Sequence, residues 1–535
     1  MQKRAAVLIA AGAVMASAVT AVPSTAEPRT TEPQATALTW KACATQQYPK
    51  LQCATVRAPL DHEDPSGEQV TLALSRIPHT AKTSQGPLLV NPGGPGASGL
   101  DMAGFVAASL PAKVAAQYDI VGFDPRGVGA SKPSLDCKPG YFAPVRPDSL
   151  PRDVDTERTN LTRAASFARA CDDKYGALLR HMGTVSAAKD LDVIRQALGA
   201  EKISYFGYSY GTYLGAVYAK LFPQRVRRAV LDSVVDPQAV WYQANLAQDL
   251  AFDARHKAFL AWVARHDATY RLGTDPAKVE ARWYAMRAAL AKDPAAGKVG
   301  PAELEDTYLP GGYYNGYWPT LAEAFSAYVN EKDPAPLVSA YESLAAADPT
   351  DDNGYSVYAA VQCRDAAWPR DWGVWHRDNW AVHSKAPFST WNNAWYNAPC
   401  AFWPVGSSTP PDIANDALPP VLLFQATEDA ATPYGGGVTV HRALRGSSLV
   451  VEEGGGNHAI TLSGNACLDG HLARYLETGQ VPRATAGGTE KGTGTETGTG
   501  TGTTADADAV CAATAEPKPR TTRAAAPLPH PAHRG

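Results

Sequence analysis

The sequence lacks several features that would place it in other protein classes. Its 535 residues hold 49 lysines and arginines against 53 aspartates and glutamates, a formal net charge of −4. Without a basic excess, we expect no surface for nucleic acid or for an anionic membrane. After the N-terminus the sequence has no apolar run of about 18 residues, so no membrane-spanning helix is predicted. It also has no CxxC pair and no histidine at ligand spacing from a cysteine, which argues against a zinc site.

The first residues have the pattern of an export signal. Lys3 and Arg4 precede an apolar, alanine-rich run that extends from residue 5 to about residue 22. Small residues at 24–26 then supply the positions that a signal peptidase reads. Because the run is short and ends in such a site, we expect a signal peptide (1–26) cleaved after Ala26, rather than an uncleaved anchor. The mature protein is therefore predicted to be secreted.

The eight cysteines fit an oxidising compartment. Their connectivity does not follow from the sequence, because eight cysteines can pair in many ways. The simplest pairing joins neighbours along the chain, and each bond would contribute about 2–4 kcal/mol by restricting the unfolded chain. This pairing gives Cys43–Cys53, Cys137–Cys171, Cys363–Cys400 and Cys467–Cys511.

Hydrophobic patterns divide the chain into a sheet with a helical insertion. Short apolar runs alternate with helical patterns from 54 to 235, which is typical of an α/β sheet with helical crossovers. Between 236 and 409 the strand-like runs disappear, and the segment is rich in alanine and tryptophan. A Gly/Thr low-complexity run over 487–504 predicts a disordered tail over 481–535. The predicted strands are 70–77, 88–90, 119–123, 203–206, 229–234, 421–425 and 449–452.

The clearest chemical signal is a G-x-S-x-G motif. The segment 207–211 reads Gly-Tyr-Ser-Tyr-Gly, directly after the predicted strand 203–206 and before a helical run over 212–222. A sharp turn between a strand and a helix exposes a serine hydroxyl at its tip, and glycines on either side avoid clashes in so tight a turn. We therefore predict that Ser209 is a nucleophile, in preference to a structural serine in a glycine-rich turn.

A serine nucleophile needs a base and an acid that orients the base. In this architecture the acid and then the histidine follow later strands. Asp429 comes after the strand 421–425, and His458 ends a glycine-rich turn after the strand 449–452. We expect His458 to be the base and Asp429 the acid, with the neighbouring Glu428 and the strand-end Asp232 as alternative acids.

The segment 91–96, Asn-Pro-Gly-Gly-Pro-Gly, follows the strand 88–90, where the oxyanion loop of such a fold belongs. Backbone N–H groups at Gly94 and Tyr210 are the predicted oxyanion donors. The segment lacks the Lys-Ser/Thr of a phosphate-binding loop. Asp124 and Arg126, in the Gly-rich segment 122–131, are expected to brace the site as structural residues.

These motifs resemble the secreted tripeptidyl aminopeptidases of actinomycetes, which are α/β-hydrolase serine exopeptidases related to proline iminopeptidases. The resemblance extends from about Trp40 to Leu476. It implies an α/β-hydrolase core (40–235 and 410–480), a helical lid (236–409), the triad Ser209, Asp429 and His458, and removal of tripeptides from free N-termini. The expected chemistry requires no metal and no organic cofactor. The long Gly/Thr tail departs from what we expect of this family.

An exopeptidase must also hold the ammonium group of its substrate, and a buried lid carboxylate would do so. Asp249, Asp253 and Asp365 are candidates, and Asp365 is our choice. The expected partners are peptides with a free N-terminus, with no nucleic acid and no membrane, and the protein is expected to be a monomer.

Two other functions are compatible with the same motifs. A secreted carboxylic-ester hydrolase would use the same triad, because fold and triad do not fix the bond that is cleaved. A non-catalytic binding protein on this scaffold would have lost a triad residue, and all three predicted ones are present.

Overall fold

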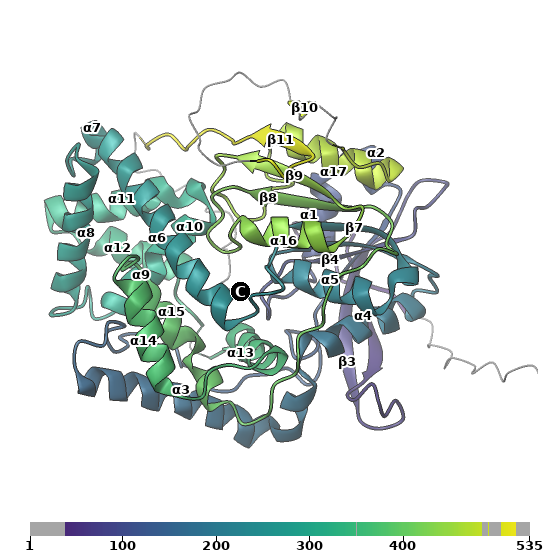
Figure 1. The fold of residues 1–535 in the computed structure, drawn as a ribbon, viewed down its shortest axis with the longest axis horizontal. Helices are drawn as coiled ribbons and strands as arrows, with labels where there is room; N and C mark the ends of the chain where they lie inside the picture. The colour runs from purple at the N-terminus through teal and green to yellow at the C-terminus, as the bar shows by residue number, and fades with distance from the viewer. Residues whose placement is uncertain (1–37, 349, 484–489, 492–503, 521–535) are drawn as a thin grey trace, which may run out of the picture. The chain divides into compact units, whose positions relative to one another are not determined.

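The structure is a computed structural model that describes residues 38–348, 350–483, 490–491 and 504–520. The predicted signal peptide (1–26) lies outside these residues. The described chain combines a mixed β-sheet with a large group of helices inserted after strand β7 (Figure 1). The predicted α/β-hydrolase class, with a helical insertion between its two halves, is confirmed.

The sheet contains all seven predicted strands and adds others at both edges. Its order is β1-β2-β3-β5-β4-β6-β7-β8-β9-β11-β10, and it is antiparallel on the β1–β3 side and parallel from β5 onward. Side chains of β4, β6 and β8 are buried, as expected for parallel strands covered by helices on both faces. The strands are β1 (Lys41–Ala42), β2 (Gln52–Pro59), β3 (Gln69–Ile77), β4 (Pro87–Asn91), β5 (Asp119–Phe123), β6 (Ile203–Tyr208), β7 (Val226–Asp232), β8 (Val421–Ala426), β9 (Ser448–Glu453), β10 (Glu490–Lys491) and β11 (Ala509–Ala512).

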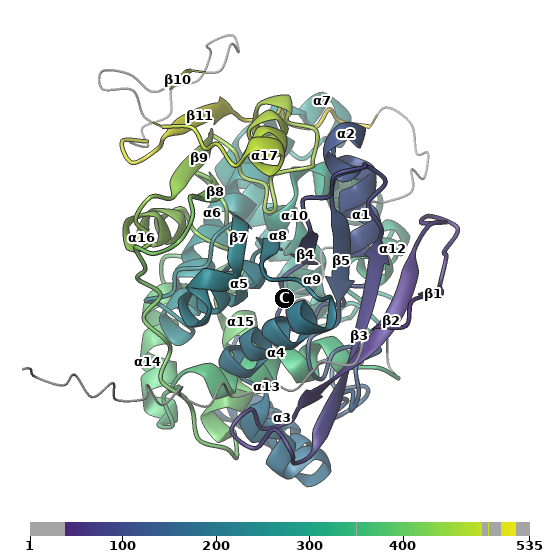
Figure 2. The same ribbon diagram turned by 90° about the vertical axis from the view of Figure 1, so that its right-hand side faces the viewer.

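Helices cover both faces of the sheet, as Figure 2 shows. On one face, α1 and α17 pack on a cluster that includes Val90, Phe206, Val230 and Phe424. On the other face lie α4, α5 and α16, where Gly215 of α5 fits closely against Tyr205 of β6. The helices of the core are α1 (Met102–Ser109), α2 (Ala112–Ala115), α3 (Val154–Tyr175), η1 (Gly176–His181), α4 (Thr184–Ala197), α5 (Tyr210–Leu221), η2 (Pro223–Arg225), α16 (Gly435–Ala443) and α17 (Ala466–Thr478).

The insertion forms a helical lid with a core of its own. This core contains Trp262, Trp283 and Trp318, each almost completely buried. Within the described part of 236–409 no strand is present, as the sequence predicts. The lid elements are α6 (Tyr242–Arg265), α7 (Asp267–Tyr270), α8 (Pro276–Leu290), α9 (Pro301–Tyr308), α10 (Pro310–Tyr313), η3 (Asn315–Tyr317), α11 (Trp318–Ser326), η4 (Ala327–Glu331), α12 (Ala335–Leu344), α13 (Asn353–Asp365), α14 (Trp372–His383), α15 (Thr390–Asn397) and η5 (Ala398–Phe402).

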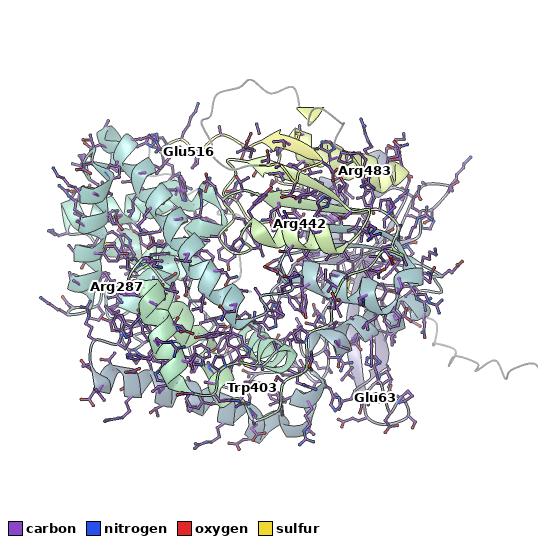
Figure 3. All side chains as sticks on the ribbon, viewed as in Figure 1. Glu63, Arg287, Trp403, Arg442, Arg483 and Glu516 are labelled. Atoms are coloured by element: carbon purple, nitrogen blue, oxygen red, sulfur yellow. A yellow bond between two sulfur atoms is a disulfide. The ribbon has the colours of Figure 1, made fainter. Side chains whose placement is uncertain are left out.

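The chain before the lid also contributes to it. Helix α3 packs on η5 and α15 of the lid. Arg287 of α8, labelled in Figure 3, donates to Asp148 and to Glu305, both at 2.6 Å. This guanidinium is buried, so its ion pair with Asp148 connects the loop before α3 to the lid. Segments before residue 236 therefore pack on the lid as well as on the core.

The prediction of a disordered tail from residue 481 is wrong for residues 504–520. Strand β11 adds in parallel to β9, and Cys511 forms a disulfide with Cys467. Further along, Glu516 (Figure 3) pairs with Arg265 of α6 at 2.7 Å, and the Pro517 carbonyl accepts from Trp262. Composition missed this segment because its order comes from pairing with a distant strand. The rest of the Gly/Thr run lies outside the described residues.

Four disulfides brace the described chain, and they are the four pairs that join neighbours along the sequence. The pairs are Cys43–Cys53, Cys137–Cys171, Cys363–Cys400 and Cys467–Cys511. Such bonds are typical of proteins that fold in an oxidising compartment. Among the described residues no helix has the length and apolarity required to cross a membrane.

Candidate active site

Ser209 occupies the turn between β6 and α5. Its backbone has φ 55° and ψ −127°, a conformation that is strained for any residue with a side chain. A Cβ added to Gly207 would lie 2.5 Å from the Gly211 carbonyl oxygen, so the first glycine of the motif is needed for space. The Ser209 N–H donates to the Asp232 carbonyl of β7 at 3.0 Å. The sheet therefore fixes the strained turn and holds Ser209 beyond the strand end.

His458 and Asp429 form a buried pair. The Asp429 oxygens lie 2.9 and 3.0 Å from Nδ1 of His458, and the Asp429 side chain has no exposed surface. Burial disfavours a charged imidazole, but the Asp429 carboxylate outweighs this effect and raises the pKa of His458 above its ordinary value. Since Asp429 occupies Nδ1, Nε2 is the ring nitrogen that a general base would use. This arrangement is that of an oriented general base.

Thr432 completes the support of the acid, and sequence reasoning did not identify it. Its hydroxyl donates to Asp429 Oδ2 at 2.9 Å, and its backbone N–H donates to Oδ1 at 3.0 Å. The Ala431 N–H also donates to Oδ1, at 2.9 Å. These bonds leave the carboxylate aimed at His458. Thr432 follows Asp429 by only three positions in the sequence Asp-Ala-Ala-Thr-Pro, and this spacing could have indicated its role.

The two alternative acids have other roles. Asp232 is completely buried and accepts from Ile460 N and Thr461 N at 3.1 and 2.8 Å, so it anchors the loop that follows His458. Glu428 pairs with Arg255 of the lid at 2.6 Å. Neither carboxylate contacts the imidazole of His458, which is paired with Asp429.

The segment 91–96 lies against the serine turn. The Asn91 side chain accepts from Gly93 N at 2.9 Å and shapes the loop. A Cβ added to Gly93 would lie 2.8 Å from Cβ of Ser209, so a residue other than glycine would displace the nucleophile. Gly94 and Tyr210 both line the cavity at Ser209. Their position is compatible with the predicted role of their N–H groups as oxyanion donors.

Asp124 and Arg126 are structural, as the sequence predicts. Asp124 accepts from Ser98 Oγ at 2.6 Å and from Gly99 N at 3.0 Å, so it holds the chain just beyond the oxyanion loop. Arg126 is buried and paired with Asp190 at 2.6 Å. Neither residue lines the cavity at Ser209.

A cavity of about 210 Å³, which we call the Ser209 cavity, lies between the core and the lid. Its walls come from the serine turn, the segment 235–248 that includes the first turns of α6, helix α13 and the loop 431–436. Tyr313 of α10 also lines it, and the Tyr313 ring packs edge-on against His458 at 5.4 Å between centroids. The candidate nucleophile therefore faces a space enclosed partly by the lid.

A second cavity of about 570 Å³ adjoins the other side of the oxyanion loop. Gly96, Ala97 and Ser98 line it, and Tyr313 lines both cavities. Five carboxylates belong to its wall. They are those of Asp306, Glu342, Asp348, Asp351 and Asp352.

The structure does not bring Asp365 to either cavity. Its carboxylate accepts from the backbone N–H and hydroxyl of Thr184, both at 2.6 Å, and from the Trp241 indole at 3.3 Å. Burial raises the pKa of Asp365 to about 6. The residue braces α13 against α4 and so lies behind the cavity wall. Asp249 and Asp253 also lie outside both cavities, bonded to Asn393 and Lys257.

The lid contacts the His458 loop directly. Arg255 of α6 donates to Glu428 and to Asn315 Oδ1, both at 2.6 Å, and Asn315 N donates to Asn457 Oδ1 at 2.9 Å. The His458 N–H donates to the Tyr313 carbonyl at 2.8 Å. The position of the candidate base therefore depends on lid residues that the sequence analysis did not single out.

One group among the described residues has the spacing of a metal site. It corrects the expectation that no histidine stands at ligand spacing from a cysteine, because His471 follows Cys467 by four positions. Cys467, His471 and Cys511 place their ligand atoms within 4.8 Å of one another. The two cysteines are joined in a disulfide, so they do not offer thiolates to a metal. The group lies on α17 and β11, away from the residues that line the Ser209 cavity.

Comparisons with known proteins identify the family of the chain. A family profile for the alpha/beta hydrolase fold matches residues 86–464. The tripeptidyl aminopeptidase of Streptomyces lividans is 45% identical over 456 residues, which cover 83% of this chain and 85% of that protein. The serine protease Hip1 of Mycobacterium tuberculosis is 34% identical over 460 residues, covering 81% and 86%.

Two further similarities complete the comparison. Carboxylesterase B of Mycobacterium tuberculosis is 33% identical over 471 residues, covering 83% of this chain and 88% of that protein. Among solved structures, the proline iminopeptidase-related protein of Thermus thermophilus matches with a TM-score of 0.32 and 14% identity, covering 79% and 96%. The chain belongs to the α/β-hydrolase family, and it is a serine hydrolase and peptidase of the tripeptidyl aminopeptidase type.

Proposed function

We propose that the protein is a secreted serine exopeptidase that releases tripeptides from the free N-termini of extracellular peptides. The observations that carry the proposal are the buried Asp429–His458 pair, 2.9 Å apart, and the strained Ser209, which faces a lid-enclosed cavity that is also lined by Thr432, the partner of Asp429. The 45% identity to a tripeptidyl aminopeptidase supports peptides as substrates. The four disulfides and the N-terminal signal pattern support secretion.

The geometry supports an acyl-enzyme mechanism. His458 Nε2 takes the proton of the Ser209 hydroxyl as its oxygen attacks the peptide carbonyl. Backbone N–H groups of Gly94 and Tyr210 stabilise the oxyanion. His458 then gives its proton to the leaving amine, and the acyl-enzyme forms. A water molecule, deprotonated by His458, releases the N-terminal fragment and restores Ser209. Asp429 orients the imidazole throughout and stabilises its charged form.

The charge around the oxyanion loop is favourable for a substrate with an ammonium group. The second cavity has carboxylates on its wall, whereas Asp236 is the one carboxylate that lines the Ser209 cavity. Asp306 and Glu342 pair with Arg146 and Lys298, and burial raises the pKa of Asp352 to about 7, so Asp348 and Asp351 supply the negative charge of this wall. A concave surface with a negative charge attracts a cation. We therefore expect the N-terminal end of the substrate to enter the second cavity, with its scissile carbonyl at Ser209.

The test compares Ala-Ala-Pro p-nitroanilide with a free amine against its N-acylated form, with Ser209→Ala as the blank. We expect fast cleavage of the free-amine substrate alone. Equal cleavage of both anilides would contradict an exopeptidase.

A carboxylic-ester hydrolase is the second candidate, because a carboxylesterase is 33% identical over most of the chain. Under that function neither anilide would be cut, whereas a p-nitrophenyl ester would be hydrolysed by the wild type and not by Ser209→Ala.

A further inference from the structure

The Ser209 cavity contains one polar side chain that the free enzyme does not use. Gln362 of α13 lines the cavity and has a relative exposure of 5%, yet its Oε1 has no hydrogen-bond partner among the described residues. A buried acceptor without a partner lowers stability, and native proteins rarely retain one without a reason. Gln362 was not among the residues that sequence reasoning selected.

Four other polar side chains on the same wall each make at least one hydrogen bond within the protein. Asn245 donates to the Trp241 carbonyl and accepts from Asn397, and Gln248 donates to the Ala431 carbonyl. Asp236 accepts from a backbone N–H at 2.9 Å, and Thr432 donates to Asp429. Among the described residues that line this cavity, Gln362 is the one with a buried side-chain acceptor that lacks a hydrogen-bond partner.

The backbone that carries Gln362 is firmly held. Its carbonyl accepts from the Trp368 indole at 2.9 Å, and the next residue, Cys363, forms a disulfide with Cys400. Three residues further along, Asp365 is bonded to Thr184 at 2.6 Å. The unpaired oxygen is therefore not explained by a mobile helix end. The last side-chain torsion of glutamine is broad, so Oε1 can adjust to a hydrogen-bond donor in the cavity.

We propose that Gln362 is a specificity-determining residue whose Oε1 accepts a hydrogen bond from a main-chain N–H of the peptide substrate. The ligand class is a peptide with an internal N–H close to the scissile bond, since Gln362 and Ser209 line the same cavity of about 210 Å³. The inference rests on the proposed peptidase function and adds to it the residue that reads the substrate main chain.

The test uses a tri-alanine p-nitroanilide with a free amine and two derivatives, each N-methylated at one of its two internal peptide bonds. The wild type is compared with Gln362→Met, which keeps the size and removes the acceptor. We expect Gln362→Met to lower kcat/KM on the parent about fivefold. N-methylation at the bond that Gln362 contacts should lower kcat/KM of the wild type about fivefold more than it lowers kcat/KM of Gln362→Met. This difference is the coupling that a double-mutant cycle measures.

Thermal unfolding supplies a readout that separates binding from a structural role. Because Oε1 is unpaired in the free enzyme, Gln362→Met should unfold at a Tm no lower than that of the wild type. Gln248→Met is the matched control, since the Gln248 amide bonds to Ala431. For this control we expect a lower Tm and an N-methylation effect equal to that of the wild type.

Each outcome is decisive. The inference is overturned if N-methylation at each bond lowers kcat/KM by the same factor in the wild type and in Gln362→Met. It is also overturned if Gln362→Met has a clearly lower Tm than the wild type. If the wild type fails to cleave the free-amine parent, the proposed function itself fails, and the inference falls with it.

Discussion

At the scale of single residues, Ser209 sits in a conformation that costs free energy and therefore requires support. Its φ of 55° and ψ of −127° are adopted easily by glycine alone. The bond to Asp232 of β7 and the packing of Gly93 against its Cβ keep it there. A hydroxyl held at a sharp turn is accessible to substrate and base, as the proposed role of Ser209 requires.

From this strain we predict that Ser209→Gly is inactive but more stable than Ser209→Ala. Glycine relieves a backbone strain of about 1–3 kcal/mol, although it also gains entropy in the unfolded chain. Thermal unfolding of the two inactive variants measures the difference. A lower Tm for Ser209→Gly would show that the turn is not strained in solution.

The pKa of His458 sets the expected pH dependence. His458 accepts a proton as a neutral base, so kcat/KM should fall as the pH drops through its pKa. Burial lowers this pKa and Asp429 raises it by more, so the acid limb should lie above the ordinary value of 6.5. A pH profile with its midpoint below 6.5 would contradict this, and Asp429→Asn should move the midpoint down.

The raised pKa of His458 also makes the free energy of unfolding depend on pH. A raised pKa in the folded protein means that His458 contributes stability below the pKa of the unfolded chain. This contribution is lost as the pH rises through the higher pKa of the folded state.

At the scale of elements, helix α6 of the lid supports the His458 loop. The Arg255 side chain is 6% exposed and bonds to Glu428 next to the candidate acid. A Cβ added to Gly456 would lie 2.1 Å from the Arg255 guanidinium carbon, so the glycine-rich turn fits around this side chain. Gly456, two residues before His458, therefore serves close packing against the lid.

We predict that Arg255→Met lowers kcat about tenfold to a hundredfold with a much smaller change in KM, because a shifted base misaligns proton transfer. Steady-state kinetics on the free-amine anilide measures both constants. Arg265→Met is the control from the same helix, because its pair with Glu516 is exposed on both sides. An unchanged kcat for Arg255→Met would contradict a role of this lid residue in positioning His458.

At the scale of the whole molecule, the C-terminal segment connects sheet and lid. Strand β11 extends the sheet at β9, the Cys467–Cys511 bond fixes it to α17, and Pro517 then contacts α6. The chain that closes the fold is thus the one that composition alone assigns to a disordered tail.

The length of the loop that each disulfide closes predicts which of two disulfides contributes more to the free energy of unfolding. The Cys467–Cys511 bond closes 44 residues and Cys43–Cys53 closes 10. In the chain-entropy account the first contributes about 4 kcal/mol and the second about 3 kcal/mol. The double variant Cys467→Ala/Cys511→Ala should therefore lower the free energy of unfolding more than Cys43→Ala/Cys53→Ala. Unfolding in denaturant under non-reducing conditions measures the order, and the reverse order would contradict the prediction.

The sequence by itself determined the seven central strands of the sheet and the candidate triad. Strands such as β6 and β8 are continuous apolar runs, and Ser209, Asp429 and His458 each follow one of them. These signals are local, because a strand, a turn and a helix follow one another within a few residues. Boundaries were less accurate: β6 extends to Tyr208 because its pairing with β7 continues to Asp232.

Only the tertiary structure decided which side chains surround the triad. Asp365, chosen from its sequence context, braces α13, while Thr432, Arg255 and the unpaired Gln362 lie at or beside the site. Arg255 and Glu428 are separated by 173 positions in the chain, so no local pattern links them. Local patterns reflect backbone geometry, whereas the direction and partner of a side chain depend on elements brought together by the packing of the lid on the sheet.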